Sequence, residues 1–171
     1  DWATHLEHID TVLQRVIKAG LVTKREKCQL GCTEIDYLGH RVTRTHITPL
    51  EETVRAITEF PRPKTKKEVQ SFCGLANYYR AFVEGFSEMM APLTDLTKGT
   101  AAKAIPSSWG TKEENAFTKV KLALSRDCRL YYPDFSKGFT LRTDASTIGI
   151  AGILLQDGKP ISYLSRKLTP A

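Results

Sequence analysis

Between residues 3 and 20, near the start of the chain, apolar side chains recur three or four positions apart. This spacing gathers the apolar side chains on one face and predicts an amphipathic helix, and Gly20 is a natural stop just past its last turn. The apolar positions are Leu6, Ile9, Val12, Leu13, Val16 and Ile17. His5 and His8 lie one turn apart on this helix, and without a third ligand nearby they are interpreted as surface residues.

A short β region is predicted next. Residues 35–43 form a strand pattern with Gly39 in its middle, and residues 45–47 are expected to return as a second short strand. Residues 21–23 are also expected to be extended. A glycine inside a strand often marks a bulge or a close approach by another backbone.

Two helical stretches follow the β region. Pro49 suits a first helical turn, and Glu51 and Glu52 complement the positive end of that helix. Val54, Ile57 and Thr58 are expected to face inward. The stretch 60–63, with its two prolines, ends this helix.

The second helix is predicted to begin at Lys66, because Thr65 followed by Glu68 forms a capping-box pair. We expect it to run to about Val83 and to stop at Gly85. A shorter helix is expected over residues 89–96.

The last third of the chain changes from helix to strand. Residues 98–106 are small and polar and are the best linker candidate. Thr111 and Glu114 form another candidate capping box, for a helix that ends near Ser125. Asp157-Gly158 is a strong hairpin signal. The predicted strands are residues 139–143, 148–156 and 160–165. The expected fold class is therefore α/β in the broad α+β sense.

Composition and charge narrow the picture. The 171 residues are 41% hydrophobic and 26% charged, which is typical of a globular protein. The net charge of +6 permits a polyanionic partner. A cluster of basic residues at the start of a predicted helix is better evidence for phosphate contact than a diffuse excess. Its members are Arg62, Lys64, Lys66 and Lys67.

Neither a membrane span nor a metal-binding cysteine set is expected. No apolar run approaches the roughly 20 residues that a bilayer requires, and no charged-then-apolar leader opens the chain. An intracellular location is therefore expected. Cys28 and Cys32 are four apart, but no second pair lies at zinc-ligand spacing. Buried free thiols are the preferred interpretation for the cysteines.

Gln70, Gly74 and Tyr78 form the first candidate site, because their spacing of four places them on one helix face. A glycine inside a helix costs about 1 kcal/mol relative to alanine. An amide, bare backbone and a ring would suit a shallow groove of a nucleic-acid duplex, with Lys64, Lys66 and Lys67 near phosphate. The alternative is a glycine that lets two helices pack closely, with Tyr78 in the core.

Tyr37-Leu38-Gly39-His40 is the second candidate site. A hairpin with a central glycine can press its backbone against a substrate strand, and the alternative is a bulge with Tyr37 and Leu38 buried. The third candidate is Asp144, at the end of a predicted strand. It can bind a hard divalent cation, but two-metal phosphodiester hydrolysis needs several converging carboxylates. The alternative is an aspartate that caps a turn.

Nine short stretches, in order along the chain, resemble the reverse transcriptase of gypsy-type long-terminal-repeat retrotransposons. Each stretch alone is weak, whereas nine in series are highly specific. They are His5-Leu6-Glu7-His8, Lys27-Cys28, Tyr37-Leu38-Gly39-His40, Phe60-Pro61-Arg62-Pro63, Phe72-Cys73-Gly74-Leu75-Ala76-Asn77-Tyr78-Tyr79-Arg80, Ala91-Pro92-Leu93, Tyr132-Pro133-Asp134-Phe135, Thr143-Asp144-Ala145-Ser146 and Ser165-Arg166-Lys167-Leu168.

The resemblance implies a division of the chain. Residues 1–48 would be the end of a polymerase palm with a primer-grip hairpin, and 49–98 a helical thumb. Residues 99–108 would be a linker, and 109–171 a connecting segment with the first strands of a ribonuclease H-like sheet.

The resemblance also implies site residues. Tyr37, Leu38 and Gly39 would hold the primer terminus, and the row of Gln70, Gly74 and Tyr78 would follow the minor groove. Arg62, Lys64, Lys66 and Lys67 would meet phosphates. Asp144 would be the first catalytic aspartate of the ribonuclease H site and a metal ligand.

The chain is therefore expected to be an internal piece of a Pol polyprotein, inactive alone. The polymerase aspartate pair of the family is expected before residue 1, and three further ribonuclease H carboxylates after residue 171. The cofactor of the complete sites would be Mg²⁺, with Mn²⁺ as a substitute. The partners would be an RNA–DNA hybrid or DNA duplex, inside a cytoplasmic virus-like particle with access to the nucleus. The alternative is a host-derived, non-catalytic module that binds nucleic acid or protein.

Overall fold

The computed structural model describes residues 1–98 and 109–169, which fall into two compact units divided between Thr33 and Glu34. The predicted linker at 99–108 lies outside the described residues. The smaller unit contains helix α1 (Trp2–Lys18) and the 3₁₀ turn η1 (Arg25–Lys27). None of the helices in the described residues is both long and apolar enough to cross a membrane.

Helix α1 confirms the first sequence prediction. The Asp1 carboxylate caps it by accepting a 2.9 Å hydrogen bond from the Thr4 backbone N–H. Gly20, with φ of +72°, terminates it as expected. His5 and His8 are exposed. Residues 21–23, which were expected to be extended, form no strand.

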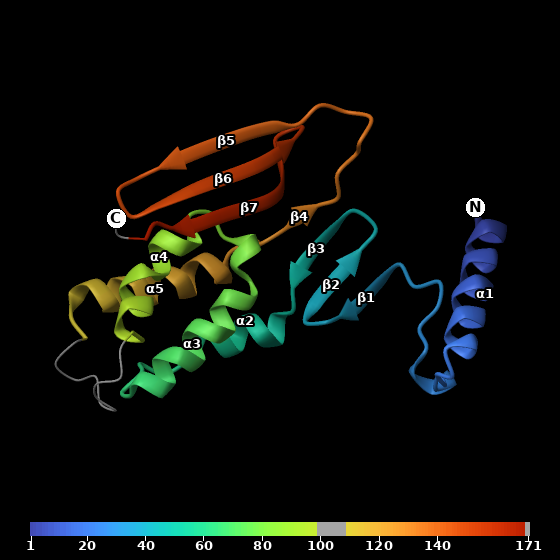
Figure 1. Cartoon of the computed structure of the whole chain (residues 1–171), viewed down its shortest axis with the longest axis horizontal. Helices are drawn as coiled ribbons and strands as arrows, with labels where there is room; N and C mark the ends of the chain where they lie inside the picture. Colours follow the sequence, from blue (N-terminus) through green and yellow to red (C-terminus); the bar gives the residue numbers. More distant parts are fainter. Residues whose placement is uncertain (99–108, 170–171) are drawn as a thin grey trace. The chain divides into compact units, whose positions relative to one another are not determined.

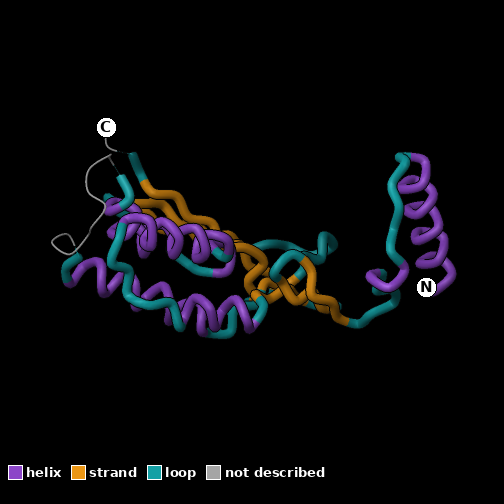
Figure 2. The backbone as a smooth tube through the Cα atoms, turned by 90° about the horizontal axis from the view of Figure 1, so that it is seen from below, coloured by secondary structure: helices purple, strands orange, loops and turns teal. Residues whose placement is uncertain are grey.

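The larger unit contains two antiparallel sheets and four α-helices among its described residues (Figure 1; Figure 2). The strands lie in the orders β1-β2-β3-β4 and β5-β6-β7. Both sheets and the helices fit the predicted α+β class. The elements are β1 (Glu34–Tyr37), β2 (His40–Thr43), β3 (His46–Pro49), α2 (Glu51–Thr58), α3 (Lys66–Tyr78), η2 (Arg80–Phe82), α4 (Phe86–Leu96), α5 (Thr111–Ser125), β4 (Leu130–Tyr131), β5 (Thr140–Ala145), β6 (Gly149–Gln156) and β7 (Lys159–Lys167).

The core of this unit lies among the helices. Helix α4 packs against α3 and α5, and α5 also packs against α2. At the centre, the ring centroids of Phe72 and Phe117 lie 4.6 Å apart. Other fully buried side chains are Ile57, Val69, Leu93, Val120 and Leu124. Burial of this many apolar side chains is the main favourable contribution to the stability of the unit.

The sequence prediction of one strand over residues 35–43 was wrong. Tyr37 pairs with His40, so the chain reverses at Leu38-Gly39 and forms the β1–β2 hairpin. Leu38 has φ of +46° and Gly39 of +76°, the two positive values that a type I′ hairpin turn requires. The glycine provides a reversal rather than a bulge.

Two helix boundaries also differ from the predictions. Pro49 ends β3 opposite His40 instead of opening a helix. Helix α3 starts where Thr65 caps it, with the Glu68 N–H 3.2 Å from the Thr65 hydroxyl oxygen, but it ends at Tyr78 rather than near Val83. The chain then forms η2 and passes through Gly85, whose φ of +61° leads directly into α4.

At the second predicted capping box, Thr111 and Glu114 do not cap α5 together. The Glu113 carboxylate instead accepts a 2.8 Å hydrogen bond from the Gly110 N–H, whereas Glu114 accepts one from the indole N–H of Trp109 at 2.6 Å. Strand β4, which was not predicted, pairs with β3 and places residues that follow α5 in the same sheet as the hairpin.

Strand β7 is fastened to the helices by polar contacts as well as by packing. The Ser165 hydroxyl accepts a 3.0 Å hydrogen bond from the backbone N–H of Ser87 at the start of α4. The Arg80 guanidinium donates to the Ser165 carbonyl at 2.5 Å. Lys167 Nζ lies 2.7 and 2.8 Å from the two carboxylate oxygens of Asp95. The β5–β7 sheet is therefore held against the helices at several points.

The Asp95 contacts predict a pH-dependent stability. Hydrogen bonds from Lys167 and Lys98 hold the pKa of Asp95 below its usual value of 3.8. A lowered carboxylate pKa stabilises the fold above pH 3.8, and this stabilisation disappears as the pH falls through the lower, folded-state pKa. Because the carboxylate is half exposed, Asp95→Asn should lower the free energy of unfolding at pH 7 by only about 0.5 kcal/mol.

Urea unfolding at pH 7 and at pH 2.5 measures this effect. The difference between wild type and Asp95→Asn should shrink at pH 2.5, whereas the matched variant Glu59→Gln, on an exposed residue, should change little at either pH. A difference that persists undiminished at pH 2.5 would show that the ion pair is not its source.

The Asp157-Gly158 turn between β6 and β7 is also type I′, with φ of +50° and +75°, and the two turns supply a second prediction. An alanine at either Gly39 or Gly158 would be forced into positive φ, at a cost of roughly 1–2 kcal/mol. A Cβ at Gly158 would meet nothing within 4 Å, whereas one at Gly39 would lie 3.1 Å from the Tyr79 hydroxyl and 3.2 Å from Tyr78 Cε1. Gly39→Ala should therefore destabilise the chain by about 1 kcal/mol more than Gly158→Ala.

Thermal or urea unfolding of the two single variants tests this difference. Equal losses would mean that the tyrosines move aside without cost and that the Gly39 turn is not tightly enclosed.

Candidate nucleic-acid interface

Helix α3 has one buried face and one open face. The buried face consists of Val69, Phe72 and Ala76, and Tyr79 continues it at the helix end. The positions predicted to contact nucleic acid, Gln70, Gly74 and Tyr78, all lie on the exposed face. We call these three residues the α3 row.

The alternative in which Gly74 lets two helices pack closely is wrong. A Cβ built at Gly74 would meet nothing within 4 Å. Tyr78 is 54% exposed and is not a core residue. Packing within the described residues therefore does not explain why a glycine stands at position 74. The stability that a glycine costs in the middle of a helix is not offset by closer helix packing.

The hairpin turn is also exposed. Tyr37 and Leu38 are 61% and 68% exposed, so the alternative of a bulge that buries them is wrong. Asp36 and Arg41 brace the two strands across the hairpin, with 2.8 and 3.1 Å between guanidinium and carboxylate. This contact holds the pKa of Asp36 below its usual value.

The structure brings the hairpin turn and the α3 row together. The Tyr78 hydroxyl donates to the Leu38 carbonyl at 2.5 Å, and the Tyr79 hydroxyl donates to the Gly39 carbonyl at 2.7 Å. The imidazole of His40 packs against the rings of Tyr78, Tyr79 and Phe82, with centroids 5.3–5.4 Å apart. Two groups of residues predicted separately from the sequence thus form one continuous surface.

The sequence analysis included His40 in the hairpin candidate without assigning it a role, and it missed Tyr79, which supports the hairpin turn from the core. Tyr79 lies next to a predicted residue, and the doubled tyrosine at 78–79 was a usable signal. Adjacent positions on a helix face different directions, so one tyrosine of such a pair can stay exposed while the other enters the core.

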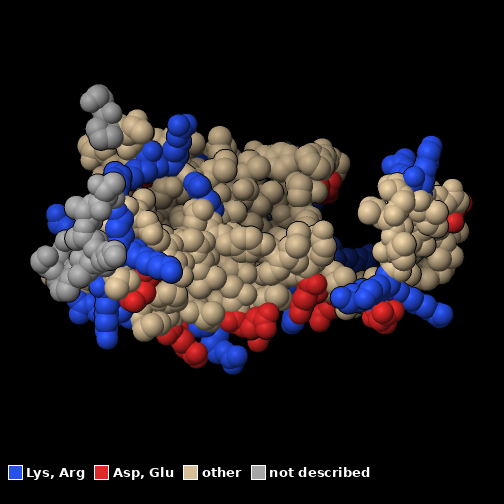
Figure 3. Space-filling view, turned by 60° about the horizontal axis from the view of Figure 1, so that its bottom comes forward, with Lys and Arg blue, Asp and Glu red and all other residues tan. Residues whose placement is uncertain are grey.

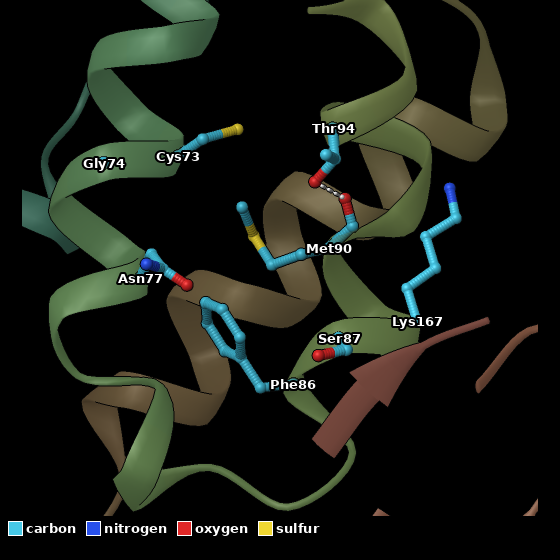
Figure 4. Close-up of a pocket in the computed structure, with 8 residues that line it drawn as sticks. All are labelled: Cys73, Gly74, Asn77, Phe86, Ser87, Met90, Thr94 and Lys167. Atoms are coloured by element: carbon cyan, nitrogen blue, oxygen red, sulfur yellow. Dashed lines mark hydrogen bonds between the residues drawn. The ribbon is translucent and has the colours of Figure 1, made fainter. Parts of the chain in front are cut away.

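A groove of about 360 Å³ lies beside the α3 row, between α3 and α4 (Figure 4). Phe86 and Met90 of α4 point into it and give it an apolar floor, and Asn77 of α3 adds a polar group. Its lining residues are Cys73, Gly74, Asn77, Phe86, Ser87, Met90, Thr94 and Lys167. Burial raises the pKa of the Cys73 thiol to about 11, so this sulfur is protonated at neutral pH and is a poor nucleophile.

The predicted basic cluster separates into two parts. Lys64 and Lys67 are exposed near the start of α3. Lys66 Nζ instead donates to the Lys98 carbonyl at 3.0 Å. Arg62 turns towards α5, where it lies 3.3 Å from the Glu114 carboxylate and 5.5 Å from the centroid of a Trp109 ring. Figure 3 shows that many Lys and Arg side chains gather at one end of the larger unit, whereas Asp and Glu side chains are frequent along its lower edge in this view.

Asp144 lies in the exposed edge strand β5, opposite Ala151. Its carboxylate accepts a 2.9 Å hydrogen bond from the Ala145 N–H. Within residues 1–98 and 109–169, no three His, Cys, Asp or Glu side chains gather closely enough to hold a metal ion. The described residues therefore form no complete metal site around Asp144.

The cysteines are less buried than predicted. Cys28 and Cys32 are exposed, and Cys73 and Cys128 are half-buried. Cys28 and Cys32 follow η1 in the smaller unit, where the described residues form no core that could enclose them. The expectation of buried thiols was therefore wrong for this pair.

Residues 109–171 match the family described as an RNase H-like domain found in reverse transcriptase. The Pol polyprotein of transposon gypsy from Drosophila melanogaster is 40% identical over 96% of this chain. Those of transposons 297 and opus, from the same organism, are 36% and 37% identical over 96% and 98% of the chain. The chain spans only 15–18% of these relatives.

Solved structures agree with these sequence relatives. The foamy viral protease-reverse transcriptase in complex with an RNA/DNA hybrid matches 98% of this chain and 23% of that protein, with a TM-score of 0.77 and 26% identity. A second foamy viral structure, in complex with double-stranded DNA, matches 99% of this chain and 30% of that protein, with a TM-score of 0.79 and 27% identity. By sequence and by fold, the chain belongs with the reverse transcriptase–ribonuclease H region of gypsy-type retrotransposon Pol polyproteins.

Proposed function

We propose that the α3 row and the adjoining hairpin turn grip the primer–template duplex of a reverse transcriptase. Such an enzyme copies RNA into DNA and degrades the RNA of the hybrid. The observation that carries the proposal is the α3 row of Gln70, Gly74 and Tyr78. It is open to solvent, free of a packing role at Gly74, and joined to the exposed turn of the hairpin.

The chemistry of the row fits a duplex groove. The Gln70 amide can both donate to and accept from sugars and base edges. At Gly74 a sugar–phosphate backbone can approach the helix backbone directly, because no side chain intervenes. The Tyr78 ring offers an apolar face to a ribose, although its hydroxyl is engaged with the Leu38 carbonyl.

Phosphate contacts belong to a smaller set than the sequence predicted. Lys64 and Lys67 are exposed beside the first turn of α3, where the helix dipole also favours anions. Arg62 and Lys66 remain candidates only if they exchange their present contacts with Glu114 and Lys98 for phosphates. The solved complexes with RNA/DNA hybrid and with double-stranded DNA support a duplex as the partner.

Tyr37, Leu38 and Gly39 are proposed to hold the primer terminus. Their turn projects Tyr37 and Leu38 into solvent, and it lies next to the row that would carry the body of the duplex. In the same proposal, residues 1–48 are the palm end, 49–98 the thumb, and 109–171 the connection and the ribonuclease H-like sheet.

Asp144 is proposed as one ligand of a ribonuclease H metal site, with Mg²⁺ or Mn²⁺ as the ion. The described residues do not fit such a site unaided, because two-metal hydrolysis needs several converging carboxylates and no three ligand side chains gather among these residues. No hydrolytic step is therefore assigned to this chain alone. Action inside a cytoplasmic virus-like particle belongs to the same proposal. The relatives named above are transposon polyproteins and lend no support to a host-derived module.

Binding of a labelled RNA–DNA hybrid across a salt series tests the proposed function. Wild type should bind with an affinity that falls linearly with the logarithm of the salt concentration. Gly74→Leu should weaken binding by about tenfold, a loss of about 1.4 kcal/mol, because its side chain would fill the approach to the helix backbone. The variant should be at least as stable as wild type, since leucine favours helix over glycine.

The matched control for this variant is Gly138→Leu, on an exposed glycine whose Cβ would also meet nothing within 4 Å. It should leave binding unchanged. A second pair of variants tests the phosphate contacts. Lys64→Ala/Lys67→Ala should lower the salt slope by about two, whereas Lys112→Ala/Lys119→Ala, on α5, should not. A folded wild type without salt-dependent binding would refute the grip.

A further inference from the structure

Each carbonyl oxygen of the hairpin turn, at Leu38 and at Gly39, has two hydrogen-bond partners. The Leu38 carbonyl oxygen lies 2.5 Å from the Tyr78 hydroxyl and 2.8 Å from Nδ1 of His40. The Gly39 carbonyl oxygen accepts from the Tyr79 hydroxyl at 2.7 Å and from the Leu50 N–H at 3.2 Å. Each carbonyl therefore uses both of its lone pairs, and three of the four partners come from outside the turn.

Tyr79 differs from Tyr78 in its surroundings. Tyr79 is 1% exposed and belongs to the helical core. Its ring lies edge-on to the rings of Tyr78 and Phe82, at centroid distances of 4.9 and 6.1 Å. Phenylalanine would fill the same space, so the core alone does not require a hydroxyl at this position.

The hydroxyl of Tyr79 is a dependable donor. Burial raises its pKa above the usual value of 10, against the opposing effect of a hydrogen bond with Thr53 of α2. The group therefore keeps its proton throughout the physiological range. Its contact with the Gly39 carbonyl joins the rigid end of α3 to the tip of a hairpin that lies 40 residues earlier in the chain.

The turn has little freedom to shift by itself. Gly39 has φ of +76°, and a Cβ there would crowd both tyrosines. The exposed side chains of Tyr37 and Leu38 project from this enclosed turn. Among the four partners of the turn carbonyls, the two tyrosine hydroxyls come from the end of α3 and tie the turn to the α3 row. The buried hydroxyl of Tyr79 cannot exchange its partner for water.

We propose that Tyr79 is a positioning residue, whose hydroxyl holds the hairpin turn in register with the α3 row so that the primer end and the duplex body are bound together. The inference rests on the proposed grip function. It assigns Tyr79 no contact with nucleic acid. Its role is to fix where the turn stands with respect to Gln70 and Gly74.

The test compares two RNA–DNA hybrids of equal duplex length, one with a recessed DNA 3′ end and one with blunt ends. Wild type should bind the recessed end more tightly. Tyr79→Phe, which keeps the ring and loses the hydroxyl, should reduce that preference three- to tenfold, as expected for about one hydrogen bond. Its affinity for the blunt hybrid and its salt slope should equal those of wild type, because the α3 row is intact.

Tyr163→Phe is the matched control, because it removes a hydroxyl from a half-buried tyrosine of β7 and should change neither affinity. Tyr78→Phe removes the neighbouring bond to Leu38 from an exposed residue, so it cannot disturb the core, and it should also reduce the preference for the recessed end. It keeps the test decisive if Tyr79→Phe unfolds.

The outcomes separate the two proposals. If wild type binds hybrids but shows no preference for the recessed end, or if folded Tyr79→Phe keeps that preference, the positioning role is overturned while the grip stands. If Tyr79→Phe does not fold, a Tyr78→Phe variant that keeps the preference overturns it. If wild type binds neither hybrid, the grip fails and the positioning role falls with it. A uniform loss of affinity for both hybrids in Tyr79→Phe would mark a structural role only.

Discussion

The arrangement of the larger unit depends on one constraint, which is that α3 must bury Val69, Phe72 and Ala76 against the other helices. When one face of a helix is buried in a core, the residues of the opposite face must point outward. Burial of these residues therefore turns the α3 row outward and leaves Gly74 bare. It also carries Tyr79 inward at the helix end, where its hydroxyl meets the hairpin. The buried core face and the exposed α3 row are two consequences of the same helical rotation.

Local signals in the sequence were sufficient where the cause of a structure is itself local. Thr65 and Glu68 lie three positions apart and were read correctly as the start of α3. Asp157-Gly158 was recognised as a turn because aspartate and glycine both tolerate positive φ. The same reasoning placed the α3 row on one face, since that inference needs only the helical period.

The sequence was insufficient where distant residues decide. Leucine rarely adopts positive φ, so the sequence did not predict a turn at Leu38-Gly39. The hydroxyls of Tyr78 and Tyr79 hold it there. Arg62 reads as a phosphate ligand by proximity to the lysines, but Trp109 and Glu114 draw it away. The sequence was sufficient to place Asp144 on its strand. The further carboxylates that the proposed metal site would need cannot be inferred from a single edge strand.

Strand β4 has a consequence for how the chain acquires its structure. It pairs Tyr131 and Leu130 with residues of β3 that lie far earlier in the chain, and the intervening segment contains α2, α3, α4 and α5. Bringing the two ends of so long a segment together costs chain entropy, and the strand contacts offset this cost only after they have formed. We therefore expect the two strands to pair late in folding, because contacts between residues far apart in the chain form more slowly than the local contacts of the helices between them.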